Sequence, residues 1–71
     1  MIRADSAKIE WDPSKKHWHV QIHVGAEVIK RSCPKLSESA DDEALRAETV
    51  NTARDEGYDL DPARVEIAHQ P

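Results

Sequence analysis

Residues 17–24, with the sequence HWHVQIHV, alternate strictly between a polar and a large apolar side chain. Because a β-strand has a side-chain period of two, the two sets must lie on opposite faces of a sheet. The apolar set is Trp18, Val20, Ile22 and Val24, and the polar set is His17, His19, Gln21 and His23. We predict that this stretch is the central strand of a small sheet.

The residues before this stretch predict a hairpin partner. Residues 7–11 also alternate, with Lys8 and Glu10 on their polar side, and residues 12–16 (DPSKK) have the composition of a turn. One register places all the apolar side chains of both strands on the same face. It pairs Trp11 with Trp18, Ile9 with Val20 and Ala7 with Ile22.

The residues after it predict a third strand, over 27–33. Gly25 and Ala26 suit a two-residue type II′ turn, which prefers glycine at its first central position. Pairing Val24 with Glu27 divides the strand between two faces. Ile29, Arg31 and Cys33 then lie on the apolar face, and Val28, Lys30 and Ser32 on the polar face.

A helix is predicted from Ala40 to Glu56. Ser39 is the expected N-cap, and Gly57 is typical of the position that follows a helix. At 100° per residue, small side chains form a stripe that would let the helix approach the sheet closely. The stripe consists of Ala40, Ala44, Ala47, Val50 and Ala53. Leu45 lies off the stripe and is a candidate for contact with a partner.

A last strand is predicted over 63–69, with Val65 and Ile67 facing inward. The fold class is therefore α+β, a two-layer β-β-β-α-β sandwich with an antiparallel three-stranded meander, a C-terminal strand and one helix on one sheet face. The last strand could pair with the first strand or the third, and we favour the first. We expect residues 1–6 to be flexible and residues 7–70 to form one domain.

Composition favours a small cytoplasmic protein that self-associates. Seventy-one residues bury a small core, which a homodimer would enlarge. The single cysteine allows no internal disulfide, and no apolar run approaches the roughly 20 residues of a membrane span. Charge is unevenly divided: residues 1–36 hold seven Lys or Arg and four acids, whereas residues 37–71 hold three Arg and ten acids.

The polar face of the predicted sheet is the candidate ligand or partner face, because one helix covers only one face. Its residues are Lys8, Glu10, His17, His19, Gln21, His23, Val28, Lys30 and Ser32. His17 and His19 lie two apart, and the predicted register adds Glu10, so these three are candidate zinc ligands. The alternative is that the histidines are ordinary solvent-facing residues.

Nucleic-acid binding is the second candidate function. In topology alone, a three-stranded sheet backed by a helix, here residues 7–56, resembles DNA-binding domains of the AP2 and integrase amino-terminal type. That resemblance implies a sheet pressed into the major groove. The central strand carries histidines and a glutamine where such domains usually carry arginines, and the net charge is −4.

We expect no enzymatic activity. Cys33 is predicted on the covered face, where a thiol is inert, and Asp59 with Asp61 falls far short of a calcium loop. The expected function is a non-enzymatic binding module that forms a homodimer through its sheet. If the histidine face forms that contact, protonation would bring cations together and loosen the dimer.

Overall fold

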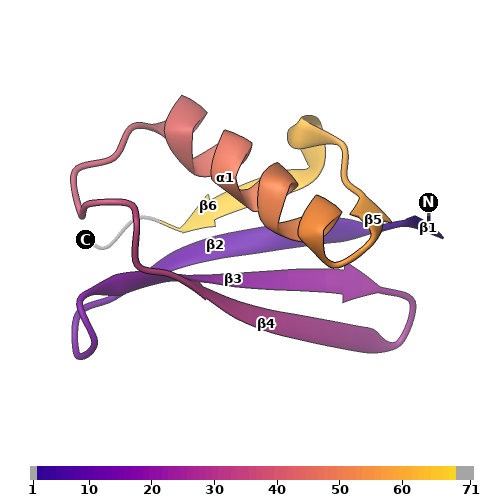
Figure 1. Cartoon of the computed structure of the whole chain (residues 1–71), viewed down its shortest axis with the longest axis horizontal. Helices are drawn as coiled ribbons and strands as arrows, with labels where there is room; N and C mark the ends of the chain where they lie inside the picture. Colours follow the sequence, from indigo (N-terminus) through magenta and orange to yellow (C-terminus); the bar gives the residue numbers. More distant parts are fainter. Residues whose placement is uncertain (1, 69–71) are drawn as a thin grey trace.

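The computed structural model describes residues 2–68 and contains one main sheet with a helix across one of its faces (Figure 1). The strand order is β4-β3-β2-β6. The elements are β2 (Ser6–Asp12), β3 (His17–Val24), β4 (Glu27–Cys33), α1 (Asp42–Asp55) and β6 (Val65–Ala68). The predicted α+β sandwich is confirmed, and β3 and β4 have the predicted bounds.

The β2–β3 hairpin has the predicted register. Trp11 pairs with Trp18, and the two indole rings meet edge to face with centroids 5.5 Å apart and planes at 67°. This geometry is the favourable one for aromatic pairs. Ile9 and Val20, the next pair on the same face, are fully buried.

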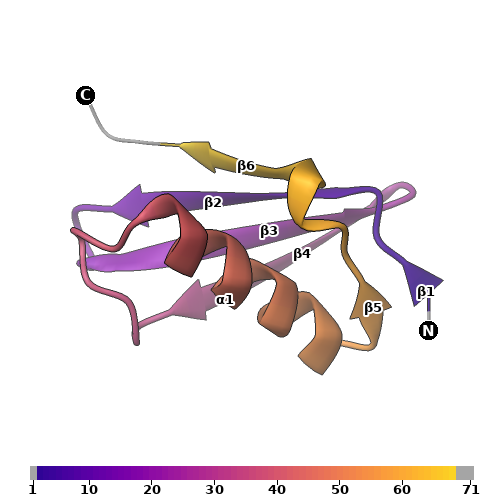
Figure 2. The ribbon, with the colours of Figure 1, turned by 90° about the horizontal axis from the view of Figure 1, so that it is seen from above.

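β6 lies parallel to β2 at one edge of the sheet, as predicted, and β4 forms the other edge (Figure 2). β6 begins at Val65, later than predicted, because the 3₁₀ helix η1 (Pro62–Arg64) occupies the preceding residues. The Asp61 carboxylate starts η1 by accepting a hydrogen bond from the Ala63 amide at 3.0 Å. His69, the predicted last strand residue, lies outside the described residues.

The start of α1 differs from the prediction. Asp41, not Ser39, is the N-cap, and its side chain accepts a hydrogen bond from the Ala44 amide at 2.8 Å. The amide of Ala40 bonds instead to the Ser37 carbonyl at 3.1 Å, within a turn that delays the helix. α1 ends at Asp55 with Glu56 as C-cap, and Gly57 follows with φ of +89°, a conformation that glycine adopts without strain.

The buried face of the helix only partly matches the predicted stripe: Ala53 is buried, and Ala40 and Val50 are partly buried against the core. The helix turns a different line of side chains most fully to the sheet. Its buried residues are Leu45, Thr49 and Ala53, spaced four apart, whereas Ala47 is exposed. The reason is side-chain size, since burying a leucine removes more apolar surface from water than burying an alanine. Leu45 is fully buried, so its predicted role as a partner contact is wrong.

Residues near the N-terminus belong to the folded domain. β1 (Ile2–Arg3) pairs in parallel with β5 (Tyr58–Asp59), and Ala4 is buried. The amide of Ala4 donates to the Asp59 carbonyl at 2.8 Å. Sequence reasoning expects this segment to be flexible, because six mostly polar residues give no sign that they pair with a strand more than fifty residues away.

The N-cap assignment can be tested by paired substitutions. Asp41→Ala should lower the free energy of unfolding by about 1 kcal/mol, because the Ala44 amide loses its acceptor. Ser39→Ala should change it far less. The measurement is urea unfolding followed by circular dichroism, and equal effects of the two substitutions would contradict the assignment.

The β2–β3 loop offers a second test. Lys16 has a φ of +56°, the left-handed region that a residue with a Cβ adopts at a cost. Lys16→Gly should raise the free energy of unfolding by about 0.5–1 kcal/mol, because relief of a strain of about 1–2 kcal/mol exceeds the entropic cost of glycine, about 0.5–1 kcal/mol. Lys15→Gly, which relieves no such strain, should leave it unchanged or lower it in the same unfolding measurement.

Candidate functional site

The sheet face opposite α1 is covered by no other element of residues 2–68 (Figure 1). We call it the open face. The alternating burial of β2 and β3, together with the strand registers, places on it all the residues predicted for the ligand or partner face. The residues of the open face are Ser6, Lys8, Glu10, Asp12, His17, His19, Gln21, His23, Val28, Lys30, Ser32, Glu66 and Ala68.

The registers arrange these side chains in rows that run across the strands. One row reads Ser32, His19, Glu10 and Ala68, and the next reads Lys30, Gln21, Lys8 and Glu66. Neighbours within a row have Cβ atoms about 4.5–5.5 Å apart, close enough to interact directly. The face is therefore a continuous polar surface rather than a set of isolated side chains.

Charge is divided between the two halves of the open face. Among the described residues, the half formed by β3 and β4 carries the cation Lys30 and no acid. It also carries the imidazoles of His17, His19 and His23, which are charged only when protonated. The half formed by β2 and β6 carries Glu10, Asp12 and Glu66. The cation that this acidic half also carries, Lys8, lies 3.9 Å from the Glu66 carboxylate.

Asp12 and His19 are the most closely connected polar pair of this face. Nε2 of His19 lies 2.8 Å from Oδ2 of Asp12, and the other carboxylate oxygen accepts from the Ser14 and Lys15 amides of the loop. The hydrogen bond from His19 lowers the pKa of the Asp12 carboxyl, aided by the loop amides. Asp12 therefore both shapes the hairpin loop and orients the His19 ring.

His17 packs beside this pair. Its ring contacts the His19 ring edge to face, with centroids 4.7 Å apart. Its Nε2 is buried and has no hydrogen-bond partner among the described residues. Leaving a buried polar atom unpaired generally costs about 1–3 kcal/mol. The unpaired Nε2 therefore offsets part of what packing of the His17 ring contributes to stability.

The proposed zinc ligands lie close to one another but are not arranged as a metal site. Glu10 does lie opposite His19, but His19 directs its Nε2 to Asp12 instead. Within residues 2–68, no group of three or more His, Cys, Asp and Glu side chains is arranged to hold a metal ion. This arrangement therefore does not support His17, His19 and Glu10 as a metal site, because the Asp12 carboxylate, two residues along β2 from Glu10, already binds the imidazole.

Cys33 lies on the opposite, helix-covered side of the sheet, at the end of β4. It is buried, and its Sγ lies 3.7 Å from Oγ1 of Thr52. Burial raises the pKa of the thiol, so the group is protonated at neutral pH and a weak nucleophile. This agrees with the predicted position of Cys33 on the covered face.

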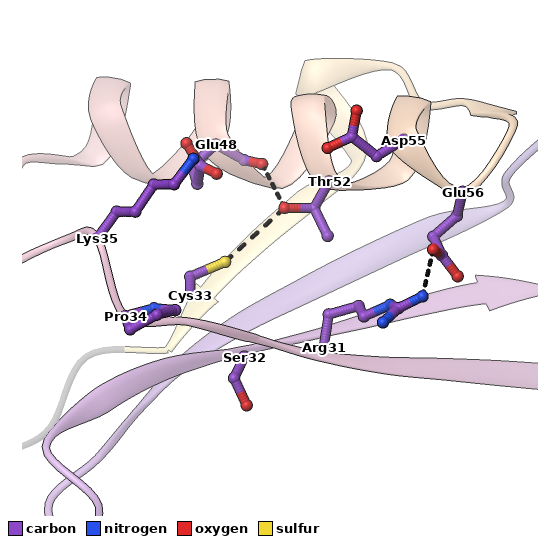
Figure 3. Close-up of a pocket in the computed structure, with 9 residues that line it drawn as sticks. All are labelled: Arg31, Ser32, Cys33, Pro34, Lys35, Glu48, Thr52, Asp55 and Glu56. Atoms are coloured by element: carbon purple, nitrogen blue, oxygen red, sulfur yellow. Dashed lines mark hydrogen bonds and ion pairs between the residues drawn. The ribbon is translucent and has the colours of Figure 1, made fainter.

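A groove of about 310 Å³ opens beside Cys33, between the end of β4 and α1 (Figure 3). Its lining residues are Arg31, Ser32, Cys33, Pro34, Lys35, Glu48, Thr52, Asp55 and Glu56. Arg31 forms an ion pair with Glu56 across it. Thr52 donates its hydroxyl to the Glu48 carbonyl at 2.8 Å, so the polar floor is internally bonded.

Sequence reasoning missed two acids of the open face, and it also missed the groove. Asp12 shares the parity of Lys8 and Glu10, and Glu66 lies between the inward-facing Val65 and Ile67, so both could have been found from alternation. The groove could not, since it depends on how α1 crosses the edge of the sheet.

Comparisons of the chain with protein-family models, with curated proteins and with solved structures find no match. In the described part of the chain, no helix has the length and apolar character needed to cross a membrane.

The Asp12–His19 contact predicts a specific pH dependence. A lowered carboxyl pKa means that the contribution of Asp12 to stability is present above its ordinary pKa of about 3.9 and is lost as the pH falls through the folded-state value. Wild type should therefore lose more stability than Asp12→Asn on acidification below pH 4. In His19→Ala, the Asp12 pKa, measured from the carboxyl carbon by NMR, should rise towards its ordinary value.

Proposed function

We propose that this chain is a non-enzymatic interaction module that forms a homodimer by packing the open faces of two copies together. The observation that supports this most strongly is the division of charge on the open face. A surface whose two halves carry opposite charge is complementary to itself, which is what a two-fold symmetric contact requires.

The charge pattern also favours one orientation of the two copies. A two-fold axis parallel to the strands, between β2 and β3, sets the β3–β4 half of one copy over the β2–β6 half of the other. Glu10, Asp12 and Glu66 then face the imidazoles and Lys30 of the partner. An axis across the strands would instead set β3 on β3, with like charges opposed.

Burial supports the proposal as well. The inner side chains of the open face are half-buried, and Val28 at its margin is 47% exposed. A second copy would cover this surface and add to the small core of a chain of this length. It would also give Nε2 of His17 access to a polar partner from the facing copy.

Nucleic-acid binding fits the same surface less well. The β3–β4 half joins the exposed Lys15 and Lys16 of the loop, which would suit phosphates. However, Glu10, Asp12 and Glu66 share the face and would repel a polyanion laid across it. We therefore place nucleic-acid binding second.

The favoured orientation reverses the expected effect of pH. In sequence reasoning, all imidazoles of a histidine-lined contact face one another, so protonation loosens it. In the favoured orientation the acids of the partner lie above the imidazoles, so protonation of an imidazole would tighten the contact. Lys30 faces the same acids, and Lys8 faces the basic half.

Sedimentation equilibrium at pH 8 and pH 6 tests the proposal. Wild type should associate, and more strongly at pH 6. Glu10→Lys/Glu66→Lys should sediment as a monomer at both values, because its open face carries only one sign of charge apart from Asp12. The matched control, Glu38→Lys/Glu43→Lys, makes the same charge change on exposed residues away from the open face and should associate like wild type.

Two outcomes would contradict the proposal. One is association of the Glu10→Lys/Glu66→Lys variant equal to that of wild type. The other is weaker association of wild type at pH 6 than at pH 8, which would mean that imidazoles face imidazoles. Circular dichroism of each variant checks that the monomer is folded.

A further inference from the structure

We propose that the β4 edge is a second self-association surface, on which β4 of another copy adds in antiparallel register about a two-fold axis at Ile29. This contact joins the two sheets edge to edge, and it goes beyond the proposed function because it does not use the packing of open faces. β4 is seven residues long, contains no proline and stands at the end of the strand order. Such an edge is a template for another strand.

The hairpin geometry shows which main-chain groups are free to pair. In a hairpin with a two-residue turn, the residues flanking the turn, here Val24 and Glu27, form a hydrogen-bonded pair, and bonded and non-bonded pairs then alternate. The amides and carbonyls of Ile29 and Arg31 are thus directed to β3. Those of Val28, Lys30 and Ser32 are directed outward, to the free edge.

Charge favours this register over those centred on Lys30 or Arg31. With the axis at Ile29, Glu27 of each copy lies opposite the partner's Arg31, so that the pairing creates two cross-strand ion pairs. The half-buried Ile29 meets the partner's Ile29 on the same side of the sheet. An axis at Lys30 or at Arg31 would set two like charges directly opposite each other, which is unfavourable.

Arg31 can bind the Glu27 carboxylate of the second copy in addition to Glu56. Its side chain is 52% exposed, and although it already bonds Glu56, a guanidinium has five N–H donors. Val28 and Lys30 are exposed as well and would pair through their main chains alone. The pairing therefore leaves the ion pair between Arg31 and Glu56 in place.

The groove beside Cys33 provides the space that this register needs. Counting outward from Ile29, the partner's Gly25 lies opposite Cys33 and the partner's Ala26 lies opposite Ser32. The tip of the partner's hairpin, its two smallest residues, therefore comes to the mouth of the groove of about 310 Å³ under α1 (Figure 3). A bulky turn would meet α1 at this point.

Engineered cysteines test the register directly. In the Cys33→Ser background, Ile29→Cys places the introduced thiol directly opposite the same thiol of the second copy. The two residues form a non-hydrogen-bonded pair, in which the Cβ atoms approach most closely. In a glutathione redox buffer this variant should form a covalent dimer at least about tenfold more than Arg31→Cys, whose two thiols lie four positions apart across the strands. Non-reducing electrophoresis gives the fraction linked.

A charge-reversal variant gives a second test, in which the thiol stays at position 29 and only the charge opposite Arg31 changes. Adding Glu27→Arg to the Ile29→Cys variant sets the introduced guanidinium against the partner's Arg31, and linking should fall towards the Arg31→Cys level. Equal linking at positions 29 and 31, or no effect of Glu27→Arg, would overturn the proposal. Adding Glu10→Lys/Glu66→Lys to the Cys33→Ser/Ile29→Cys variant should leave the covalent dimer intact. Loss of the open-face contact can therefore be told apart from loss of the edge contact.

Discussion

The contact between the two indoles of the β2–β3 hairpin is the interaction on which the rest of the structure depends. Trp11 and Trp18 are 8% and 3% exposed and meet edge to face beneath the helix layer. Nε1 of Trp18 donates to the Ser37 carbonyl at 2.8 Å, which holds the segment between β4 and α1 over the sheet. Since side chains alternate along a strand, burying these rings directs His17 and His19 to the opposite face.

The open face and the β4 edge are consequences of this arrangement. A chain with a single α-helix, of 14 residues, in its described part can cover one face of a four-stranded sheet and no more. The main chain crosses from β4 to β6 over the covered face, which leaves the outer edge of β4 without a neighbouring strand among the described residues. Both proposed contacts therefore use surfaces that this fold leaves uncovered. In both proposals, complementary charge rather than an apolar patch brings the two copies together.

Sequence reasoning predicted the sheet well because its signals are local. Alternation over residues 17–24 and the glycine at position 25 fix the meander, and its register follows from keeping tryptophan opposite tryptophan. The helix was predicted less well. Small residues indicate a stripe through Ala47, whereas Leu45 sets the buried face, and the N-cap is Asp41 where Ser39 is predicted. The pairing of residues 2–3 with residues 58–59 depends on tertiary contact and left no local signal.

In the candidate site too, features with a local sequence signal were predictable and features that depend on tertiary contact were not. The residues that share the open face were predictable from parity, but the partner of each side chain was not, and His19 bonds Asp12 rather than joining Glu10. Hydrogen exchange of the Trp18 indole N–H, followed by NMR, is the most direct test of the central arrangement. The account predicts exchange many times slower than that of a solvent-exposed indole, whereas exchange at the free rate would show that Trp18 does not lie beneath the helix layer and would contradict it.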